Sequence, residues 1–311
     1  MSEARDETPL RVVAVTYSPG PTLDAFLASL ATATTRPVEV VLADNGSTDG
    51  APERAAARSA DVRFVPTGGN VGYGAAANVG LAGLTDGYAV IANPDVQFEP
   101  GSIDELLAVA ARWPRAATVG PAIRTPNGEL YPSARDLPRL STGAGHAMLG
   151  WIWPANPWTA RYRREREEPR ERPAGWLSGS CFLVDVAAFW SVGGFDPGYF
   201  MYFEDVDLAQ RLSRKGYLHV YAPSAVVTHE GGHATQRQPH RMQRVHHTSA
   251  IRYLSRQYPG ARNIPLRAAL RAGLGARMLV SYVSGRVAAG APFQRKATEL
   301  GTERRRPRTR T

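Results

Sequence analysis

The sequence contains one cysteine and no long apolar run. Its single cysteine, Cys181, excludes an internal disulfide framework and any zinc site that needs several cysteines. No segment of about 18 residues is apolar without charges or helix breakers, so we expect no membrane-spanning helix. The first residues, MSEARDETPLR, are polar and mixed in charge, which is not the pattern of a signal peptide. These absences predict an intracellular protein with a soluble body.

Acidic residues are scarce at the C-terminal end. Residues 262–311 include twelve basic residues and two acidic ones, so this segment carries a formal charge of +10, whereas the whole chain carries +9. Residues 1–261 are therefore close to neutral, which disfavours a uniformly basic nucleic-acid-binding domain. The 311 residues, 43% of them hydrophobic, can bury a sizeable core in one large domain or about two smaller ones.

Strand-like and helix-like segments alternate over the first 125 residues. Valine-rich runs predict strands at 11–16, 38–43, 62–65, 88–92 and 118–123, and amphipathic runs predict helices at 22–33, 47–59, 73–84 and from 102. Further on, we expect a strand at 176–184, a helix at 204–215, short strands at 218–222 and 225–228, and a helix at 244–258. The alternation predicts an α/β fold with a mostly parallel central sheet, helices on both faces, and ligands at the carboxyl ends of the strands.

Two polar turns follow predicted strands. Asp44 lies in LADNGSTDG, where its carboxylate can accept the N–H of a pyrimidine base; an Asx-turn is the alternative. Asn93-Pro94-Asp95 closes the fourth strand, and the proline stiffens the turn. Asp95 can bind a hard divalent cation there and so neutralise a diphosphate leaving group, as glycosyl transfer from a nucleotide sugar requires. A simple structural turn is the alternative for Asp95 as well.

A cluster of carboxylates opens a predicted helix. Glu204, Asp205 and Asp207 follow the aromatic loop GFDPGYF at 194–200. A helix N-terminus favours negative charge, but one carboxylate is enough for that purpose. The cluster therefore favours catalysis, because a carboxylate there can take a proton from an acceptor hydroxyl. His229 ends a later strand before two glycines, which makes it a candidate metal ligand, although lone histidines are most often structural.

A glycine-rich segment suggests a competing function. Gly72-Tyr73-Gly74-Ala75-Ala76-Ala77 fits a dinucleotide-binding fingerprint, and Asp95 lies about 20 residues further on. That fingerprint normally turns tightly out of a strand, whereas Pro66–Val71 intervenes here. It also leaves the carboxylates at 204–207 unexplained. A nicotinamide- or flavin-dependent oxidoreductase is therefore disfavoured.

Taken together, these motifs resemble the inverting glycosyltransferases of family 2, which have the GT-A fold. The matching segments are VVAVTYSPG (12–20), LADNGSTDG (42–50), GGNVGYGAAANVG (68–80), ANPDV (92–96), WLSGSCFLVD (176–185), GGFDPGYFMYFEDVDLAQRLSRKGY (193–217) and His229. The resemblance implies a GT-A domain over residues 1–261, with a nucleotide-sugar-binding half at about 10–125 and an acceptor half at 126–261. A basic helical tail at 262–311 would follow it.

By this resemblance, the first half binds the nucleotide sugar. The residues implied beside the nucleoside are Thr16, Tyr17 and Asp44, and those in the loop beside the diphosphate are Asn70, Gly72 and Asn78. Asp95 would be the surviving carboxylate of the family's Asp-x-Asp motif and would bind Mg²⁺ or Mn²⁺ together with His229. Many members have an aspartate where this chain has Asn93. Because an amide is a weaker ligand than a carboxylate, an obligatory metal stays open.

The resemblance also implies a reaction. Asp205 would be the general base, with Glu204 and Asp207 as supporting neighbours. Within the family, TYSPGP and the aromatic, basic tail most resemble the rhamnosyltransferases of actinobacterial cell-wall assembly, which move rhamnose from dTDP-rhamnose to N-acetylglucosaminyl-diphospho-decaprenol. Another nucleotide-sugar donor or polysaccharide acceptor is the alternative within this class, and a catalytically silent nucleotide-sugar-binding module is the alternative outside it.

The tail has a helical pattern of its own. Apolar residues recur there every four positions, at Leu266, Leu270, Leu274, Met278 and Tyr282. A basic amphipathic helix followed by an arginine cluster predicts contact with an anionic membrane surface, at about 1 kcal/mol per nearby charge. The expected location is thus cytoplasmic, on the inner face of the cell membrane. A solvated tail or an RNA-binding arm is the alternative, and no nucleic-acid partner is expected.

Overall fold

The computed structural model describes residues 9–138, 169–231 and 239–276. Within them the main-sheet strands are β1 Leu10–Thr16, β2 Val38–Asp44, β3 Val62–Pro66, β4 Tyr88–Ala92, β5 Val96–Phe98, β6 Ala116–Arg124, β7 Leu130–Tyr131, β9 Arg172–Ala174, β11 Cys181–Asp185 and β12 Leu218–His229. A small second sheet pairs β8 Ala134–Arg135 with β10 Trp176–Leu177. The helices are α1 Thr22–Ala33, α2 Ala51–Arg58, α3 Tyr73–Leu81, α4 Ser102–Arg112, α7 Val186–Ser191, α8 Glu204–Arg214, α10 Pro239–Gln257 and the 3-10 helix η2 Ala261–Asn263.

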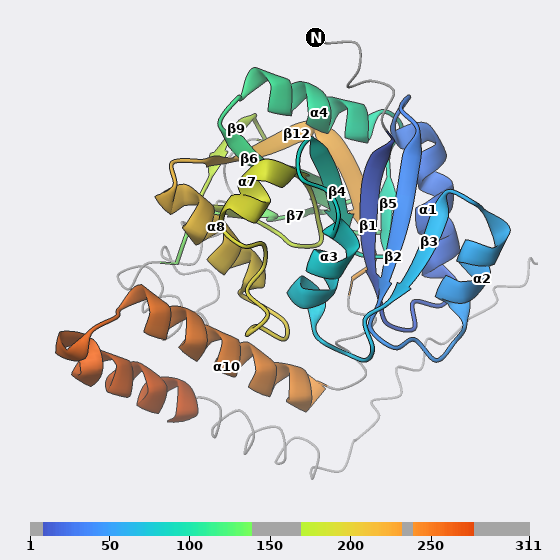
Figure 1. Ribbon diagram of the computed structural model, residues 1–311. Coiled ribbons are helices and arrows are strands. Elements are labelled where there is room, and N and C mark those ends of the chain that lie inside the picture. Colours follow the sequence, from blue (N-terminus) through green and yellow to red (C-terminus); the bar gives the residue numbers. More distant parts are fainter. Residues whose placement is uncertain (1–8, 139–168, 232–238, 277–311) are drawn as a thin grey trace, which may run out of the picture.

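The central strands are buried on both faces. Almost every side chain of β1 (LRVVAVT) is inaccessible, because β-branched residues fit a pleated sheet that is covered by helices on both sides. Val12 packs with Phe26 of α1 and Leu106 of α4, whereas Val13 packs in a second cluster with Leu208 of α8. The strand thus alternates between two helical layers, with α1, α2 and α4 on one face and α3, α7 and α8 on the other (Figure 1).

The sheet is mixed rather than purely parallel. Its main path runs in the order β3-β2-β1-β4-β11-β6-β12-β5. The strands β3, β2, β1 and β4 are parallel, and β11 then runs antiparallel between β4 and β6. Since β11 and β12 come from the second half of the chain, the two predicted halves share one sheet. Their junction brings the ends of β4 and β12 to one cleft.

Some local boundaries differ from those predicted. Ser47 and Thr48 do not begin the second helix; α2 begins at Ala51 after Gly50, which adopts a left-handed φ of 67°. Ser102 is the first residue of α4, and Gly101 occupies the N-cap position in a left-handed conformation; the Ser102 hydroxyl makes no hydrogen bond among the described residues. The two short strands predicted at 218–222 and 225–228 form the single strand β12, whose pairing with β6 shifts register after residue 222.

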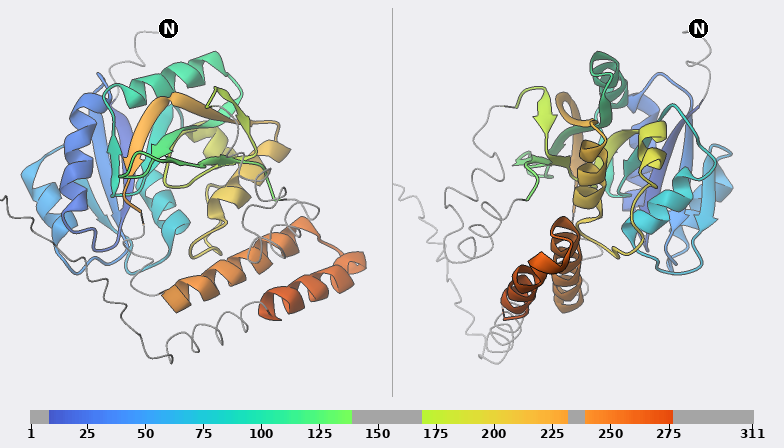
Figure 2. Two further views of the ribbon diagram at one scale, coloured as in Figure 1. Left: turned by 180° about the vertical axis from the view of Figure 1, so that it is seen from behind. Right: turned by 60° about the vertical axis from the view of Figure 1, so that its left-hand side comes forward.

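The C-terminal part of the described chain is a pair of helices. After α10 the chain turns through η2, and residues 264–276 form another helix that runs beside α10 in both Figure 1 and Figure 2. Tyr253 of α10 is buried against Val206 and Ala209 of α8. No helix among the described residues is long and apolar enough to cross a membrane. Of the apolar tail pattern, Leu266, Leu270 and Leu274 are half-buried here, and positions 278 and 282 lie outside the described residues.

Candidate active site

A cleft of about 650 Å³ opens where β1, β4 and β12 end. It collects seven of the twelve predicted site residues: Tyr17, Asn70, Asn93, Asp95, Glu204, Asp205 and His229. The other five, Thr16, Asp44, Gly72, Asn78 and Asp207, are not among the residues that line it. Residues predicted to bind the donor, residues predicted to bind a metal and the predicted base therefore line one cleft. The remaining five residues lie outside its lining.

Asp44 is the centre of a hydrogen-bonded turn. Its Oδ1 accepts the Thr16 hydroxyl at 2.6 Å, and its Oδ2 accepts the backbone N–H groups of Gly46 and Ser47, each at 2.9 Å. Asp44 is 3% exposed, so these bonds satisfy a carboxylate that water hardly reaches. This is the Asx-turn alternative, and it fixes the ends of β1 and β2 beside the exposed ring of Tyr17.

The glycine-rich segment holds the aromatic loop. Asn78 donates to the Phe195 carbonyl at 2.8 Å and accepts the Phe195 N–H at 2.9 Å, which clamps that residue from both sides. Gly72 has a φ of 91°, and a Cβ there would lie 2.3 Å from the carbonyl oxygen of Phe200. Only glycine allows this approach. Gly72 and Asn78 thus place the loop that leads into α8.

Asp95, His229 and Asn93 meet at the ends of β4 and β12. Asp95 Oδ1 lies 3.1 Å from His229 Nε2, and Asn93 Nδ2 lies 3.2 Å from the same nitrogen. Asp95 Oδ2 accepts the Gly231 N–H at 3.1 Å. Burial alone would raise the pKa of Asp95, but the hydrogen bonds from His229 and the backbone outweigh it and lower that pKa. Asp95 is therefore ionised at neutral pH.

This carboxylate–imidazole pair fits a divalent cation. Two adjacent ligands of an octahedral ion with bonds of about 2.1 Å lie about 3.0 Å apart, which matches the separation of Asp95 Oδ1 and His229 Nε2. Among the described residues no three His, Cys, Asp or Glu side chains gather at one point. Asp95 and His229 are thus the two candidate ligands among the described residues, and phosphate oxygens of a bound substrate would supply others.

Asp205 lies at the first turn of α8 and lines the same cleft. Its Oδ2 accepts the Gly179 N–H at 3.0 Å, and its Oδ1 accepts the N–H of Val206 at 2.8 Å. Burial raises the pKa of Asp205, and these two hydrogen bonds oppose the rise without cancelling it. A carboxylate of this kind is held in one orientation and is more basic than a free aspartate.

Glu204 differs from its neighbour. Burial and the nearby charge of Asp205 raise the pKa of Glu204 to about 8. Its Oε2 is buried without a hydrogen-bond partner among the described residues. The two carboxylates interact, and the higher pKa favours the proton on Glu204 at neutral pH.

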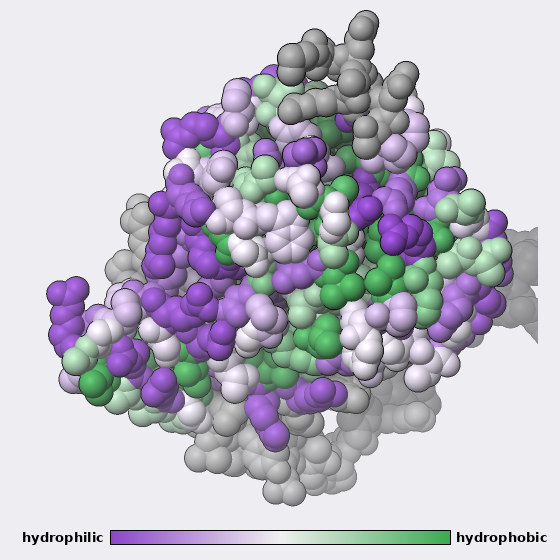
Figure 3. Space-filling view, viewed as in Figure 1, coloured by the Kyte–Doolittle hydropathy of each residue, from purple (hydrophilic) through white to green (hydrophobic). Residues whose placement is uncertain are grey.

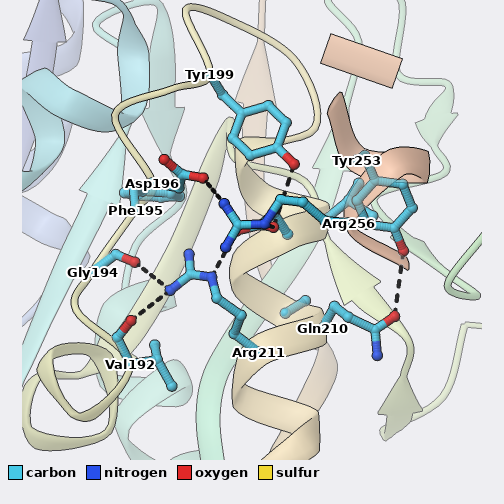
Figure 4. Close-up of polar contacts among 12 residues, drawn as sticks. Val192, Gly194, Phe195, Asp196, Tyr199, Gln210, Arg211, Tyr253 and Arg256 are labelled. Carbon is cyan, nitrogen blue, oxygen red and sulfur yellow. Dashed lines mark hydrogen bonds and ion pairs between the residues drawn. The ribbon is translucent and has the colours of Figure 1, made fainter. Parts of the chain in front are cut away.

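Asp207 points into a polar network on the other side of α8. It accepts from Arg211 Nε at 2.6 Å and from the Tyr199 hydroxyl at 3.4 Å, and Arg256 Nε of α10 lies 3.7 Å away. Figure 4 shows Arg211 also donating to the Val192 and Gly194 carbonyl oxygens, and Arg256 reaching Asp196. Asp207 is thus a residue that joins α8, the aromatic loop and α10.

Sequence reasoning did not single out several cleft residues. The Tyr73 hydroxyl donates to the Gly179 carbonyl at 2.5 Å and so supports the residue whose N–H holds Asp205. Arg135 and Trp176 face each other across the β8–β10 pair. The glycine-rich motif contains Tyr73 but gives no sign of this contact, because Gly179 is 106 residues away. Strands of two residues, such as β8, have no periodicity that would mark Arg135.

The mixed sheet, its two helical layers and a cleft that combines a buried carboxylate with a carboxylate–imidazole pair define a glycosyltransferase of the GT-A fold. The chain belongs to glycosyl transferase family 2, whose model matches residues 11–207. This match confirms the resemblance drawn from the sequence motifs.

Relatives and solved structures agree with this class. Two Mycobacterium tuberculosis strains have an N-acetylglucosaminyl-diphospho-decaprenol L-rhamnosyltransferase that is 55% identical over 279 residues, covering 86% of this chain and 91% of the relative. The rhamnosyltransferase WbbL of Escherichia coli K12 is 29% identical over 61% of this chain and 73% of its own length.

Two solved structures share the fold. GalNAc-T7 with UDP, GalNAc and Mn²⁺ has a TM-score of 0.53 at 18% identity, covering 71% of this chain and 43% of its own. The mannosyltransferase PcManGT from Pyrobaculum calidifontis with GDP-Man and Mn²⁺ has a TM-score of 0.51 at 17% identity, covering 91% of this chain and 76% of its own. At these identities the similarity establishes the α/β architecture.

Proposed function

We propose that this chain is an inverting rhamnosyltransferase that moves L-rhamnose from dTDP-β-L-rhamnose to N-acetylglucosaminyl-diphospho-polyprenol, in assembly of the linker of cell-wall arabinogalactan. The observation that carries the proposal is Asp205, a fixed and basic carboxylate in the same cleft as Asp95 and His229. The sugar and the acceptor are supported by the 55% identity to the mycobacterial relatives and by their name.

In this reaction Asp205 removes the proton from an acceptor hydroxyl. The hydroxyl oxygen attacks the anomeric carbon from the face opposite the nucleotide, so a β-L-rhamnosyl donor gives an α-L-rhamnoside. The backbone N–H groups of Gly179 and Val206 hold the carboxylate in place, and burial raises its pKa, which makes it more basic than a free aspartate. Glu204, being protonated, leaves Asp205 as the one base of the pair.

The donor would lie along the other wall of the cleft. The exposed ring of Tyr17 is available to the nucleoside, and Asn70 lines the path toward the diphosphate. Asp95 and His229 would hold Mg²⁺ or Mn²⁺, and this cation supplies positive charge that stabilises the departing diphosphate. Mn²⁺ accompanies the nucleotide in the GalNAc-T7 and PcManGT structures, which supports a divalent ion here.

We also propose that the C-terminal helices bind an anionic membrane surface, where a polyprenyl-linked acceptor would lie. No acidic residue occurs between Glu230 and Glu299. On the face shown in Figure 3, hydrophilic side chains lie among paler and hydrophobic ones at the lower left, over α10 and the helix that follows it. Full-length protein should pellet with anionic vesicles and less so at high salt, because salt screens exposed charges. Equal pelleting with neutral vesicles would contradict this assignment.

The donor and acceptor are tested by transfer of labelled sugar to a synthetic N-acetylglucosaminyl-diphospho-polyprenol. We expect product from dTDP-rhamnose and not from UDP-sugars, and a lower rate with EDTA that added Mg²⁺ or Mn²⁺ restores. Product from a UDP-sugar alone would replace the proposed donor. A rate that EDTA leaves unchanged would remove the cation from the proposal while keeping the base.

A further inference from the structure

Arg135 is a cleft residue held in one position by its surroundings. Its guanidinium lies 5.3 Å from the ring centre of Tyr131 and 5.2 Å from that of Trp176. Nε donates to the Pro132 carbonyl at 2.7 Å, and one terminal nitrogen donates to the Tyr131 hydroxyl at 2.9 Å. Trp176 is itself fixed, since its Nε1 donates to the Asp136 carbonyl at 3.1 Å. The side chain is therefore ordered before any ligand binds.

The charge of Arg135 is not neutralised by a carboxylate of the described residues. No described Asp or Glu oxygen lies within 4.0 Å of its guanidinium nitrogens. The hydrogen bonds named above use two of the five guanidinium N–H groups and only neutral acceptors. Arg135 is thus an oriented guanidinium at the wall of a cleft, with further N–H groups available to a ligand. This arrangement is typical of a site that binds an anion such as phosphate through two hydrogen bonds.

The base lies close to this cation. β10 carries Trp176 opposite Arg135, and the chain reaches Gly179, whose N–H holds Asp205, only three residues later. Trp176 also packs in one cluster with Val206, the residue after the base. In agreement with this proximity, the charge of Arg135 lowers the pKa of Asp205 against the larger effect of burial.

A short strand with exposed apolar side chains, β7, lies beside Arg135. Leu130 and Tyr131 of β7 are large side chains that are 44% and 38% exposed. Tyr131 also lines the cleft and bonds to Arg135. The base Asp205, the cation Arg135 and the exposed apolar strand β7 therefore lie side by side. A polyprenyl-diphospho-sugar has its hydroxyl, its diphosphate and its hydrocarbon chain in the same order.

We propose that Arg135 binds the diphosphate of the lipid-linked acceptor and so sets the acceptor sugar against Asp205, with Leu130 and Tyr131 contacting the start of the prenyl chain. This inference rests on the proposed function. A diphosphate is also present in the donor, but the donor's diphosphate belongs with Asp95 and His229, and Arg135 is placed beside the base. Specificity for a charged acceptor would then come from one side chain.

The test compares two acceptors that differ only in the anion. Steady-state transfer is measured with an N-acetylglucosaminyl-diphospho-lipid and with an uncharged alkyl N-acetylglucosaminide, for wild type, Arg135→Gln and Arg135→Lys. We expect R135Q to raise KM for the diphospho acceptor about tenfold or more, as for one lost charge-assisted contact. KM for the neutral acceptor and for the donor should stay within about twofold, and R135K should recover part of the loss.

Arg124→Gln is the matched control. Arg124 lines the same cleft, donates to the Gly128 carbonyl at 3.2 Å, and lies on β6 between Thr228 of β12 and Leu130 of β7. R124Q removes the same charge from the cleft wall and leaves the hydrogen bonds of Arg135 in place, so it should leave discrimination between the two acceptors unchanged. Equal losses with both acceptors in R135Q would instead assign Arg135 to the packing of Trp176. A rise confined to the donor KM would assign it to the donor's diphosphate.

Direct binding separates this inference from the proposed function. Calorimetric titration with the two acceptors measures their affinity ratio without requiring turnover. If wild type transfers no rhamnose but prefers the diphospho compound, and R135Q removes that preference, the reaction is wrong and the subsite stands. If wild type transfers rhamnose and R135Q keeps the preference, the reaction stands and the subsite is wrong.

Discussion

Replacing Asp205 should lower activity and stability strongly, whereas replacing its neighbour Glu204 should change both only slightly. Both oxygens of Asp205 accept a backbone N–H, from Gly179 and from Val206. The amide of Asp205→Asn has one acceptor, so one of these N–H groups loses its partner. Glu204 carries a proton at neutral pH, because burial and the charge of Asp205 raise its pKa to about 8. Glu204→Gln therefore replaces a neutral group with a neutral group of the same shape.

The expected sizes follow from these contacts. In D205N, one unsatisfied buried N–H lowers the free energy of unfolding by about 1–3 kcal/mol. Loss of the general base lowers kcat by about 10²–10⁴-fold, which corresponds to about 3–5 kcal/mol of activation free energy. In E204Q at pH 7, the free energy of unfolding should change by less than about 1 kcal/mol, and kcat should stay within about tenfold.

The pH dependence gives a second difference. Since the folded pKa of Glu204 is raised from 4.5 to about 8, the folded protein binds a proton there that the unfolded chain releases. Wild type should therefore lose stability as the pH rises from about 4.5 to 8, and E204Q should lose less over that range. Urea unfolding at several pH values measures this loss.

Single-turnover rhamnose transfer, together with titration of the nucleotide sugar into each variant, measures the catalytic effect. D205N should bind the donor as wild type does and transfer it slowly. Near-normal transfer by D205N would refute the assignment of the base. A loss of activity in E204Q as large as that in D205N would show that the ionised carboxylate is Glu204 instead.

Three other changes have expected outcomes. Burial lowers the pKa of His219 from 6.5 to about 4. The free energy of unfolding should therefore fall by about 3 kcal/mol as the pH drops from about 6.5 to 4. Urea unfolding of His219→Gln should lack this pH dependence. Gly72→Ala should lower the melting temperature by more than Gly83→Ala, because both have a left-handed φ but only the first Cβ would meet backbone atoms; equal losses in thermal scans would contradict this. Tyr73→Phe should lower kcat by about tenfold and leave donor binding unchanged, because it removes the hydrogen bond to the Gly179 carbonyl. Full kcat with an unaltered pH–rate profile would show that Tyr73 does not position the base.

The sequence predicted the sheet and the gathering of distant residues better than it predicted individual contacts. Parallel strands end at one edge, so Asp95 could be placed at the cleft from its strand alone. Asp44 could not be placed in this way, because an Asx-turn and a ligand contact use the same residue type at the same position. Asn78 shows the other difficulty, since its partner, the Phe195 backbone, is 117 residues away.

Side-chain direction explains the remaining differences. Glu204, Asp205 and Asp207 share one turn of α8, yet the first two line the cleft and the third bonds to Arg211 on the far side. Sequence spacing gives the positions around the helix, but which side meets the cleft depends on the aromatic loop and α10.

Helix α10 supplies counter-charges for two carboxylates that lie earlier in the chain. Arg252 Nη2 bonds to both oxygens of Asp196, at 3.0 and 2.9 Å, and Arg256 lies between Asp196 and Asp207. The family match ends at residue 207, so both arginines lie outside the matched segment while both carboxylates lie inside it. A graft of residues 11–207 alone between relatives would leave Asp196 and Asp207 without these arginines, so the graft would have to include α10.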